Sequence, residues 1–286
     1  MTAKPDPRLV RLSDLLTEWD TASTAAHIAY RTGQPAGPVT GLDKLDRELG
    51  GFLAPGVHLL HGQSGTGKTA LALQIAGETG CPALFVTCEM SALEIVRRHT
   101  ARITKTRLSS LKSGELAPSV ANALLVAAIA KAPDLTIADA TLAYADSRWI
   151  QEAAEDVRGN HPHILVVLDS IHAWVDGGPQ TNEYEAINAG LYDLLALANT
   201  LTCPVLVVAE RNRASMAAGG TSAAAGSRKL EYKSATVFDL ERDGKGDADA
   251  AGEIRVTVTL PKNRASTPNG KVPLRFNGAH QSFRQT

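Results

Sequence analysis

A run of eight residues between an apolar segment and an Ala/Leu-rich segment constrains the fold of this chain more than any other feature. The run is Gly62-Gln63-Ser64-Gly65-Thr66-Gly67-Lys68-Thr69, and it matches the pattern GxxxxGK[ST] at every fixed position. The residues before it are typical of a strand and those after it of a helix, so backbone N–H groups and a helix N-terminus converge on one anion. We expect the whole run to bind a nucleoside triphosphate, with Lys68 on the β- and γ-phosphates and Thr69 on Mg²⁺. The alternative is an ordinary glycine-rich turn, which would require neither a strand before it nor a helix after it.

Composition limits the classes of protein to which this chain can belong. Its 286 residues suffice for one large or two small domains, and 44% hydrophobic with 21% charged residues is typical of a folded, soluble chain. A formal net charge of −1 excludes a globally basic nucleic-acid coat. Any contact with nucleic acid must therefore be local.

Cysteine usage and the apolar stretches indicate a cytoplasmic protein that does not enter a membrane. The three cysteines show neither CxxC nor Cys/His spacing, and an odd number in a chain without a signal sequence favours reduced thiols in the core. The segment 121–130 is apolar but too short to span a bilayer. We expect that segment to form a buried helix.

The first part of the chain is predicted to be separate from the rest. Apolar residues recur at helical spacing between Leu12 and Tyr30, and a linker containing Gly and Pro follows at 33–38. We therefore expect an amphipathic helix and linker over 1–39 and a domain over 40–286. The apolar face of the helix can pack on its own domain or on a neighbouring subunit, and the spacing does not choose between them.

From residue 57 onward, short apolar runs alternate with helical segments, which is typical of parallel strands buried on both faces. Five runs have this character: 57–61, 83–88, 135–138, 164–168 and 204–209. Three later runs have no helix between them: 235–240, 254–260 and 272–276. We expect these three to be antiparallel strands that extend the same sheet. The sequence thus predicts an α/β fold, a mostly parallel sheet flanked by helices with a C-terminal antiparallel β extension.

Carboxylates follow three of the predicted parallel strands. Asp169 ends one apolar run and is expected to hold Mg²⁺ through its water shell, although a simple strand-terminal Asp is the alternative. Glu89 follows another run at the same edge of the sheet, where it can orient and deprotonate an attacking water. A helix-capping role before Met90 is the alternative for Glu89. Glu210 is a third candidate, as a sensor of the γ-phosphate, and ranks below Glu89.

Two loops are expected to leave the edge of the sheet that carries the nucleotide site, over 174–184 and 211–229. The second contains Arg211, Arg213, Arg228 and Lys229 around an Ala/Gly/Ser stretch. A loop of small residues flanked by cations can follow the phosphate backbone of a single strand without reading its bases. A plain surface loop is the alternative, because charges and aromatic side chains are few. In the first loop, Trp174 is expected to be a packing or interface anchor.

Several segments together resemble, in the same order, the motor domain of DnaB-type hexameric replicative helicases in the RecA-like superfamily. They are Thr40-Gly41-Leu42-Asp43-Lys44-Leu45-Asp46, Leu49-Gly50-Gly51-Phe52, the GKT loop, Cys88-Glu89-Met90-Ser91, Asp169-Ser170-Ile171-His172, Glu210-Arg211-Asn212-Arg213 and the run from Lys262 to Gly270. The resemblance covers roughly residues 40 to 284. The loop alone is generic, whereas Glu-Met-Ser combined with Lys-Asn-Arg is much more specific.

The resemblance implies ATP hydrolysis with Mg²⁺ between the subunits of a ring of six. It makes Glu89 the catalytic glutamate, and it makes Lys262 and Arg264 a pair of cations that reach the neighbour's γ-phosphate and stabilise the charge on the transferred group. Without the resemblance, these two residues could merely solvate a hairpin edge. The helix over 12–30 matches the family's linker helix, which docks on the adjacent subunit. The two loops match those that line a central channel for single-stranded DNA.

Two departures from the family pattern affect what is expected of this chain. Glu210 stands where the family usually has glutamine, which adds negative charge near the phosphates. Only about forty residues precede the motor segment, so the large N-terminal domain of replicative helicases is not expected.

The predicted function is therefore a small helicase-like motor on single-stranded DNA, with a replication or mobile-element protein as a further partner. The rival is a regulatory or adaptor ATPase, RecA/KaiC-like, whose nucleotide state controls partner binding without translocation. The short N-terminal region and the near-neutral charge favour this rival.

Overall fold

The computed structural model of the chain describes residues 10–178, 182–210, 229–244, 248–267 and 269–286. The chain divides into two compact units, residues 1–37 and 38–286. In the first unit, the 3-10 turn η1 (Leu12–Leu15) leads into helix α1 (Leu16–Thr32), and Gly33 in the left-handed conformation ends that helix. No described residue of either element is buried, so the apolar side chains of α1 are exposed.

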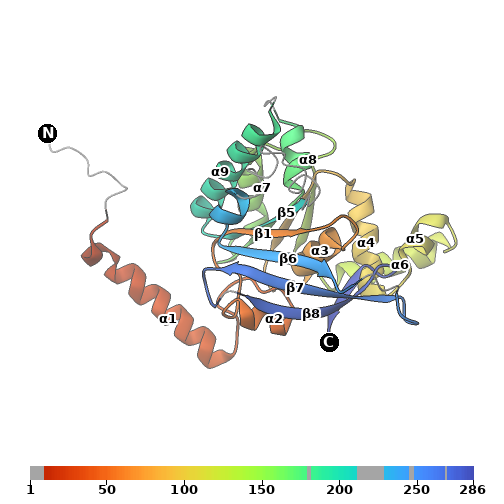
Figure 1. Ribbon diagram of the computed structural model, residues 1–286, viewed down its shortest axis with the longest axis horizontal. Helices are drawn as coiled ribbons and strands as arrows, with labels where there is room; N and C mark the ends of the chain where they lie inside the picture. Colours follow the sequence, from red (N-terminus) through yellow and green to blue (C-terminus); the bar gives the residue numbers. More distant parts are fainter. Residues whose placement is uncertain (1–9, 179–181, 211–228, 245–247, 268) are drawn as a thin grey trace. The chain divides into compact units, whose positions relative to one another are not determined.

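The second unit is built on a sheet that has nine strands among the described residues, in the order β3-β2-β4-β5-β1-β6-β7-β8-β9 (Figure 1). The strands are β1 (Gly56–Gly62), β2 (Ala83–Thr87), β3 (Leu135–Asp139), β4 (Leu165–Asp169), β5 (Pro204–Glu210), β6 (Thr236–Arg242), β7 (Glu253–Asn263), β8 (Gly270–Asn277) and β9 (Ser282–Gln285). Pairings from β3 to β6 are parallel, and those from β6 to β9 are antiparallel. The predicted fold class is confirmed.

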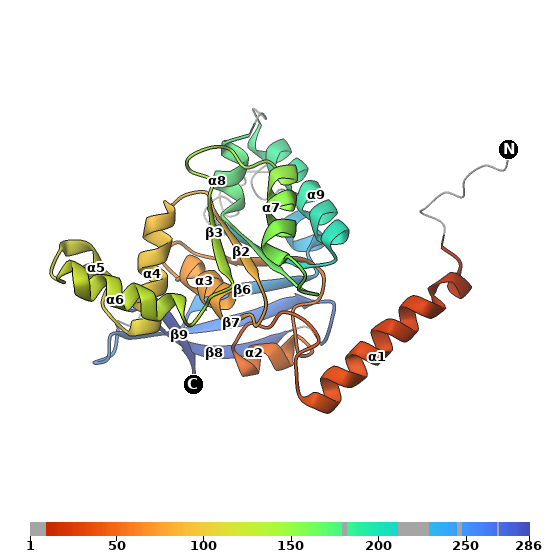
Figure 2. The ribbon, with the colours of Figure 1, turned by 180° about the vertical axis from the view of Figure 1, so that it is seen from behind.

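Alternate side chains of the strands point to opposite faces and form two hydrophobic cores. The helices that surround the sheet are α2 (Asp43–Glu48), α3 (Lys68–Glu78), α4 (Ala92–Thr104), α5 (Leu108–Ser113), α6 (Pro118–Ile129), α7 (Ser147–Arg158), α8 (Ile171–Asp176) and α9 (Glu183–Leu201). Helices α2, α3 and α4 cover one face, and α7, α8 and α9 cover the other (Figure 2). The sheet is therefore buried on both faces where its strands are parallel, which explains their continuous apolar runs.

The sequence-based prediction was wrong in three details. Strand β6 was expected to be antiparallel, but it pairs in parallel with β1 and is antiparallel only to β7. The short strand β9 was not predicted. The loop expected at 174–184 is shorter, because α8 continues to Asp176 and α9 begins at Glu183. None of the helices in the described part of the chain is long and apolar enough to cross a membrane.

The apolar segment 121–130 lies in helix α6, which is mostly exposed rather than buried. Ala128 is its one buried residue, whereas Val126 is 66% and Ile129 54% exposed. Helix α6 packs on α4, and no charged residue occurs between positions 118 and 130. The expectation of a buried helix is therefore wrong for this chain, because apolar composition does not reveal whether the same chain provides the covering surface.

Candidate active site

The glycine-rich run forms a loop between the end of β1 at Gly62 and the start of α3 at Lys68. Gly65 and Gly67 have φ values of 76° and 95°, a backbone conformation that favours glycine. A Cβ atom on Gly67 would also meet the rings of Phe283 and Phe276 at 2.9 Å and 3.0 Å. Two separate constraints, backbone conformation and close approach of two aromatic rings, therefore require glycine at position 67.

Lys68 crosses the inside of this loop. Its Nζ atom donates hydrogen bonds to the carbonyl oxygens of Gly62 and Gln63, both at 3.1 Å, and lies 4.0 Å from Oε1 of Glu210. Burial lowers the pKa of the Lys68 ammonium, and the nearby carboxylates oppose that shift. Because an ammonium can exchange carbonyl oxygens for phosphate oxygens, Lys68 is placed to bind the β- and γ-phosphates.

Asp169 ends β4 and faces the loop from the neighbouring part of the sheet. It is 3% exposed, and burial, reinforced by the charge of Glu89, raises its pKa to about 6 against the effect of a hydrogen bond from Thr69. Among the described residues, its Oδ2 atom is buried and has no hydrogen-bond partner. A buried, unpartnered carboxylate oxygen beside a threonine hydroxyl suits a water ligand of Mg²⁺.

Protein side chains alone do not make a complete metal site here. In the described parts of the chain, no group of three or more His, Cys, Asp or Glu side chains converges as a metal site would require. Thr69 and Asp169 would therefore hold Mg²⁺ together with phosphate oxygens and water. That division of ligands is typical of Mg²⁺ at nucleotide sites.

Glu89 follows β2 at the edge where β4 also ends. Thr87 of β2 is in register with Asp169 of β4, so both carboxylates lie at the same edge of the sheet. The exposed Glu89 accepts a hydrogen bond from Oγ of Ser170 at 2.5 Å. Ser91 rather than Glu89 is the N-cap of α4, since its hydroxyl accepts the Glu94 N–H. The hydroxyl of Ser170, the residue after Asp169, thus orients Glu89 toward the site.

These groups surround a cavity of about 410 Å³. It is lined by Ser64, Gly65, Gly67, Lys68, Thr69, Ala70, Glu89, Met90, Arg98, Asp169, Ser170, Val208, Glu210, Phe276, Gly278 and Gln281. The glycine-rich loop and the start of α3 supply six of them, and the others come from the residues after β2 and β4, from β4, β5, α4 and β8, and from the turn before β9. Lys68, Thr69, Asp169, Glu89 and Glu210, which sequence analysis selected separately, therefore line one cavity.

Two polar residues of the cavity were not predicted from the sequence. Arg98 lies on α4, and its Nη1 atom donates a hydrogen bond to Oε1 of Gln281 at 2.5 Å. Its Nε atom lies 3.2 Å from Glu94. Gln281 is 183 positions away in the turn before β9, so no local pattern links the two residues. The one signal for Arg98 is its place on the helix that follows Glu-Met-Ser.

Lys262 and Arg264 are not among the residues that line this cavity. They lie at the end of β7 and just beyond it, where they border a second hollow of about 830 Å³ with Lys229, Glu231, Tyr232, Val237 and Pro261. Lys262 and Arg264 therefore lie beside the same hollow, but they do not line the cavity at the phosphate loop of their own chain.

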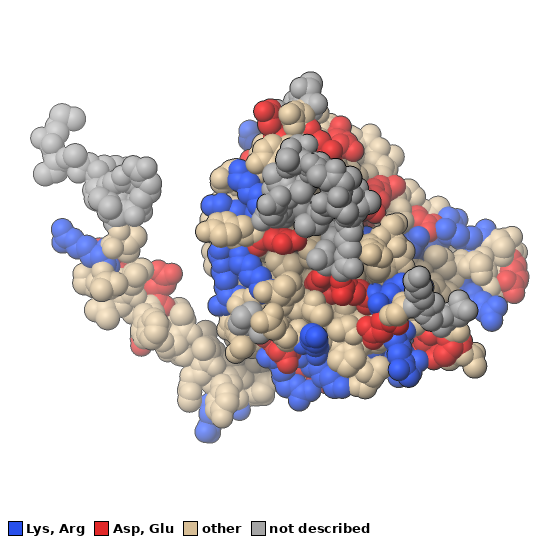
Figure 3. Space-filling model, viewed as in Figure 1, with Lys and Arg blue, Asp and Glu red and all other residues tan. Residues whose placement is uncertain are grey.

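The other predicted contact residues are placed as follows. Arg211, Arg213 and Arg228 lie outside the described residues. Nζ of Lys229 lies 5.2 Å from the ring centre of Tyr192. Trp174 is 2% exposed, and its indole N–H donates to the Ala145 carbonyl, so it is the packing residue that was expected. The face of the molecule in Figure 3 mixes basic and acidic side chains, in keeping with the near-zero net charge.

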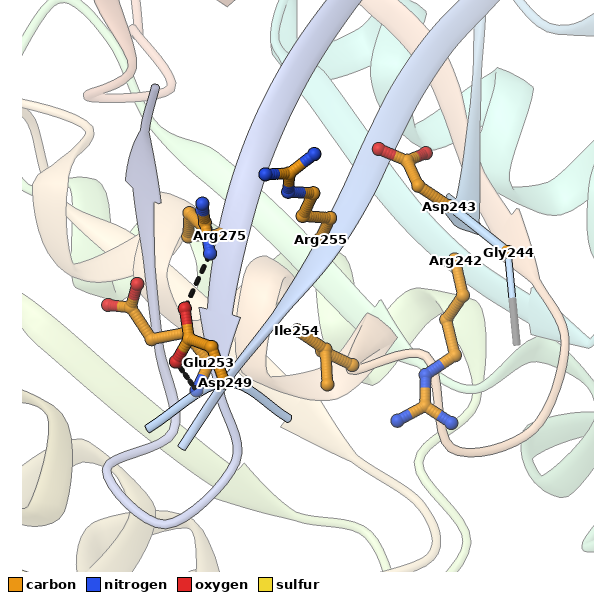
Figure 4. Close-up of a pocket in the computed structure, with 8 residues that line it drawn as sticks. All are labelled: Arg242, Asp243, Gly244, Asp249, Glu253, Ile254, Arg255 and Arg275. Carbon is orange, nitrogen blue, oxygen red and sulfur yellow. Dashed lines mark hydrogen bonds and ion pairs between the residues drawn. The ribbon is translucent and has the colours of Figure 1, made fainter. Parts of the chain in front are cut away.

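A further hollow lies at the β6–β7 hairpin and shares no lining residue with the phosphate-loop cavity (Figure 4). Its charged lining residues are Arg242, Asp243, Asp249, Glu253, Arg255 and Arg275. Arg275 donates to Asp249 at 2.5 Å, and the arginines and acids are equal in number. This balance gives the hairpin hollow no preference for a polyanion.

Comparison with known proteins yields a family match over most of the chain. The profile of the family described as "DnaB-like helicase C terminal domain" matches residues 37–285. Replicative DNA helicase DnaB of Treponema pallidum is 26% identical over 261 residues, which cover 86% of this chain and 56% of that protein. DNA repair protein RadA of Mycobacterium tuberculosis is 28% identical over 215 residues, 72% of this chain and 36% of the relative. The chain thus spans about half or less of the length of these relatives.

Solved structures share the same fold at low sequence identity. A structure of a DnaB-like replicative helicase, whose title also names its interactions with primase, has a TM-score of 0.76 and 19% identity, and the match covers 96% of this chain and 68% of that one. A KaiC-like protein from Pyrococcus horikoshii has a TM-score of 0.59 and 19% identity, over 87% of this chain and 97% of the other. These likenesses establish a RecA-like fold.

Proposed function

Because the chain belongs to the DnaB-like helicase C-terminal domain family, we propose that it is an oligomeric ATPase that moves along single-stranded DNA. The observation that carries this proposal is the convergence of Lys68, Asp169 and Glu89 on one cavity beside the glycine-rich loop. A phosphate-binding cation, a metal-binding carboxylate and a carboxylate that can activate water are the groups that phosphoryl transfer to water requires.

Each residue of the cavity has a distinct part in the proposed reaction. Lys68 exchanges the Gly62 and Gln63 carbonyls for phosphate oxygens and balances their charge. Thr69 and Asp169 would hold Mg²⁺, which would supply further charge neutralisation on the β- and γ-phosphates. Glu89, held by the Ser170 hydroxyl, orients the attacking water and accepts its proton. Glu210, 4.0 Å from the Lys68 ammonium, senses the γ-phosphate through that cation.

The reaction also needs a cation that reaches the γ-phosphate as charge develops on it. We assign this part to Lys262 and Arg264 of an adjacent subunit, because neither residue lines its own chain's cavity. A guanidinium inserted from a neighbour typically accelerates phosphoryl transfer by about 10³-fold or more. The ATPase is therefore active only as an oligomer, and we take the family's ring of six as its form.

The exposed apolar side chains support assembly. Trp19 is 74% and Leu16 69% exposed on α1, and Val126 is 66% exposed on α6. Such residues are typical of surfaces that another chain covers. We propose that α1, with the linker that completes residues 1–39, docks on an adjacent subunit, and that residues 40–286 form the ATPase domain.

DNA binding is assigned to the segment that follows β5. Arg211, Arg213, Arg228 and Lys229 would contact the phosphates of a single strand in the channel of the ring. A protein of DNA replication or of a mobile element is the proposed further partner, and the cytoplasm is the proposed location. The rival function is an adaptor role without movement along DNA. The dependence of hydrolysis on DNA distinguishes this rival from a motor.

The trans assignment can be tested by mixing two inactive variants. Glu89→Gln removes the base but keeps Lys262 and Arg264, and Arg264→Ala removes the finger but keeps the base. Each variant alone is expected to hydrolyse ATP at least about 100-fold more slowly than wild type. In an equal mixture, roughly a quarter of the head-to-tail interfaces combine an intact base with an intact finger, so hydrolysis should reappear. Arg264→Ala at the normal rate, or a mixture that stays inactive, would refute a finger supplied in trans.

A further inference from the structure

Lys262 and Arg264 share one short turn as their support. Nζ of Lys262 donates to the carbonyl oxygens of Glu231, at 3.0 Å, and of Tyr232, and it lies 5.5 Å from the centre of the Tyr232 ring. Nη2 of Arg264 donates to the same Tyr232 carbonyl at 3.4 Å. The helical turn 229–233 therefore sets the direction of both cations.

The turn is fixed to the body of the second unit. Leu230 is 2% exposed in the core that α9 covers. Ser234, which is fully buried, bonds the Leu230 carbonyl through both its N–H and its hydroxyl, at 3.0 Å and 2.6 Å. Directly after it, the Ala235 N–H donates to the Val57 carbonyl of β1 at 2.7 Å. The residues that follow the turn are therefore hydrogen-bonded to β1, the strand that leads into the phosphate loop.

The side chain of Glu231 connects the same turn to the phosphate loop. Its Oε1 atom lies 3.8 Å from Nδ1 of His61, which is 2% exposed and whose Nε2 atom lies 3.9 Å from Asp239. His61 directly precedes Gly62, whose carbonyl accepts a hydrogen bond from Lys68. One residue thus contacts His61 with its carboxylate and Lys262 with its main-chain oxygen.

A bound phosphate would compete with the Gly62 carbonyl for the Lys68 ammonium, and the backbone next to His61 would lose that hydrogen bond. We propose that the turn 229–233 transmits this change, so that nucleotide in a subunit's own site controls whether its Lys262 and Arg264 leave the Tyr232 carbonyl for the next subunit. Glu231 is the positioning residue of this relay. The inference rests on the proposed function, because it requires fingers that act in trans.

The relay can be tested in the mixed oligomers described above, at saturating magnesium ATP. In that mixture the Glu89→Gln chain donates the finger, and the Arg264→Ala chain hydrolyses. Glu231→Gln keeps the main-chain carbonyl and the size of the side chain but removes the charge that faces His61. Added to the donor, it should lower the restored hydrolysis by about fivefold or more, the range of typical coupling energies. Added to the acceptor, whose finger is not used, it should leave the rate within about twofold, below the fivefold that marks coupling.

The control is Glu152→Gln in the donor, since Glu152 is exposed on α7 and pairs with Arg148. It should leave the rate unchanged. A Glu231→Gln effect of equal size in donor and acceptor, or no effect in either, would overturn the relay. Suppose that the parent pair, Glu89→Gln with Arg264→Ala, restores hydrolysis but Glu231→Gln has no effect specific to the donor. The proposed ATPase would then stand, and the relay alone would be eliminated. Absence of rescue in the parent pair would instead count against the proposed function.

Discussion

At the scale of single residues, the site contains charged side chains that are buried away from water. Lys68 is 9% and Asp169 3% exposed. Burial lowers the pKa of Lys68 and raises the pKa of Asp169, so it favours the neutral form of each side chain. Such burial disfavours the folded state unless a ligand neutralises the charge. These buried charges therefore lower the stability of the ligand-free protein until magnesium nucleotide binds. For Asp169 this cost can be measured.

Replacing Asp169 by Asn should stabilise the ligand-free chain in a pH-dependent way. The folded pKa of about 6 exceeds the ordinary 3.8, so the folded chain holds this proton more tightly than the unfolded chain, and stability falls as pH rises between these values. Well above pH 6 the full cost applies, on the order of 3 kcal/mol. Thermal unfolding should show Asp169→Asn raising Tm at pH 8 and by much less at pH 4.5. An equal gain at both pH values would contradict the assigned burial cost.

Residue patterns also explain which parts of the site were predictable. Asp169, Glu89 and Glu210 each follow an apolar run, and parallel strands bring their carboxyl ends to one edge, so their common location follows from order along the chain. Arg98 and Gln281 obey no such rule, since they meet through the packing of α4 against the turn before β9. Long-range pairs of this kind depend on tertiary packing that local spacing does not contain.

At the scale of elements, the connection between β1 and α3 depends on contact with the end of the chain. The rings of Phe276 on β8 and Phe283 on β9 stack at 4.4 Å and lie against Gly67. The antiparallel extension thus supports the phosphate loop directly. Strand β9, missed because four residues carry too little pattern, is part of this support.

Two glycines of the loop provide a matched pair that tests this support. Gly65 and Gly67 both have positive φ, but a Cβ on Gly65 would meet no atom within 4 Å, whereas one on Gly67 would meet both rings. Gly65→Ala should cost about 1 kcal/mol in unfolding free energy from backbone strain alone. Gly67→Ala should cost about 1–3 kcal/mol more from overpacking. Urea unfolding measures both values. Equal losses would show that the aromatic pair does not constrain the loop.

Elements also show where apolar composition misleads. Helix α6 was expected to be buried because it is apolar, yet its side chains are largely exposed. The strands were identified correctly from the same kind of signal, because helices of the same chain cover both faces of the sheet. Sequence pattern gives the chemistry of a face, and it does not state which chain covers that face.

At the scale of the whole molecule, the proposed ring needs surfaces that hold subunits together. Trp19→Asp on α1 is expected to lower the mass of the assembled species in sedimentation with magnesium ATP, because it places a charge on an apolar face. The unfolding temperature of the unassembled chain, measured without nucleotide, should not change, since no residue of α1 is buried. Thr17→Asp, the same change two positions away on the helix, is the control and should leave the mass unchanged. An unaltered mass for Trp19→Asp would remove α1 from the interface.

At this scale the proposed ring uses ATP to move along a single strand, and hydrolysis measured with and without single-stranded DNA tests that function most directly. We predict that DNA raises the ATPase rate and that the stimulation weakens as salt rises from about 50 to 200 mM, because phosphate contacts release counterions. The mass of the same samples should be that of an oligomer. A rate that is indifferent to DNA at both salt concentrations, in an oligomer that hydrolyses ATP, would contradict the motor and leave a nucleotide-controlled adaptor in its place.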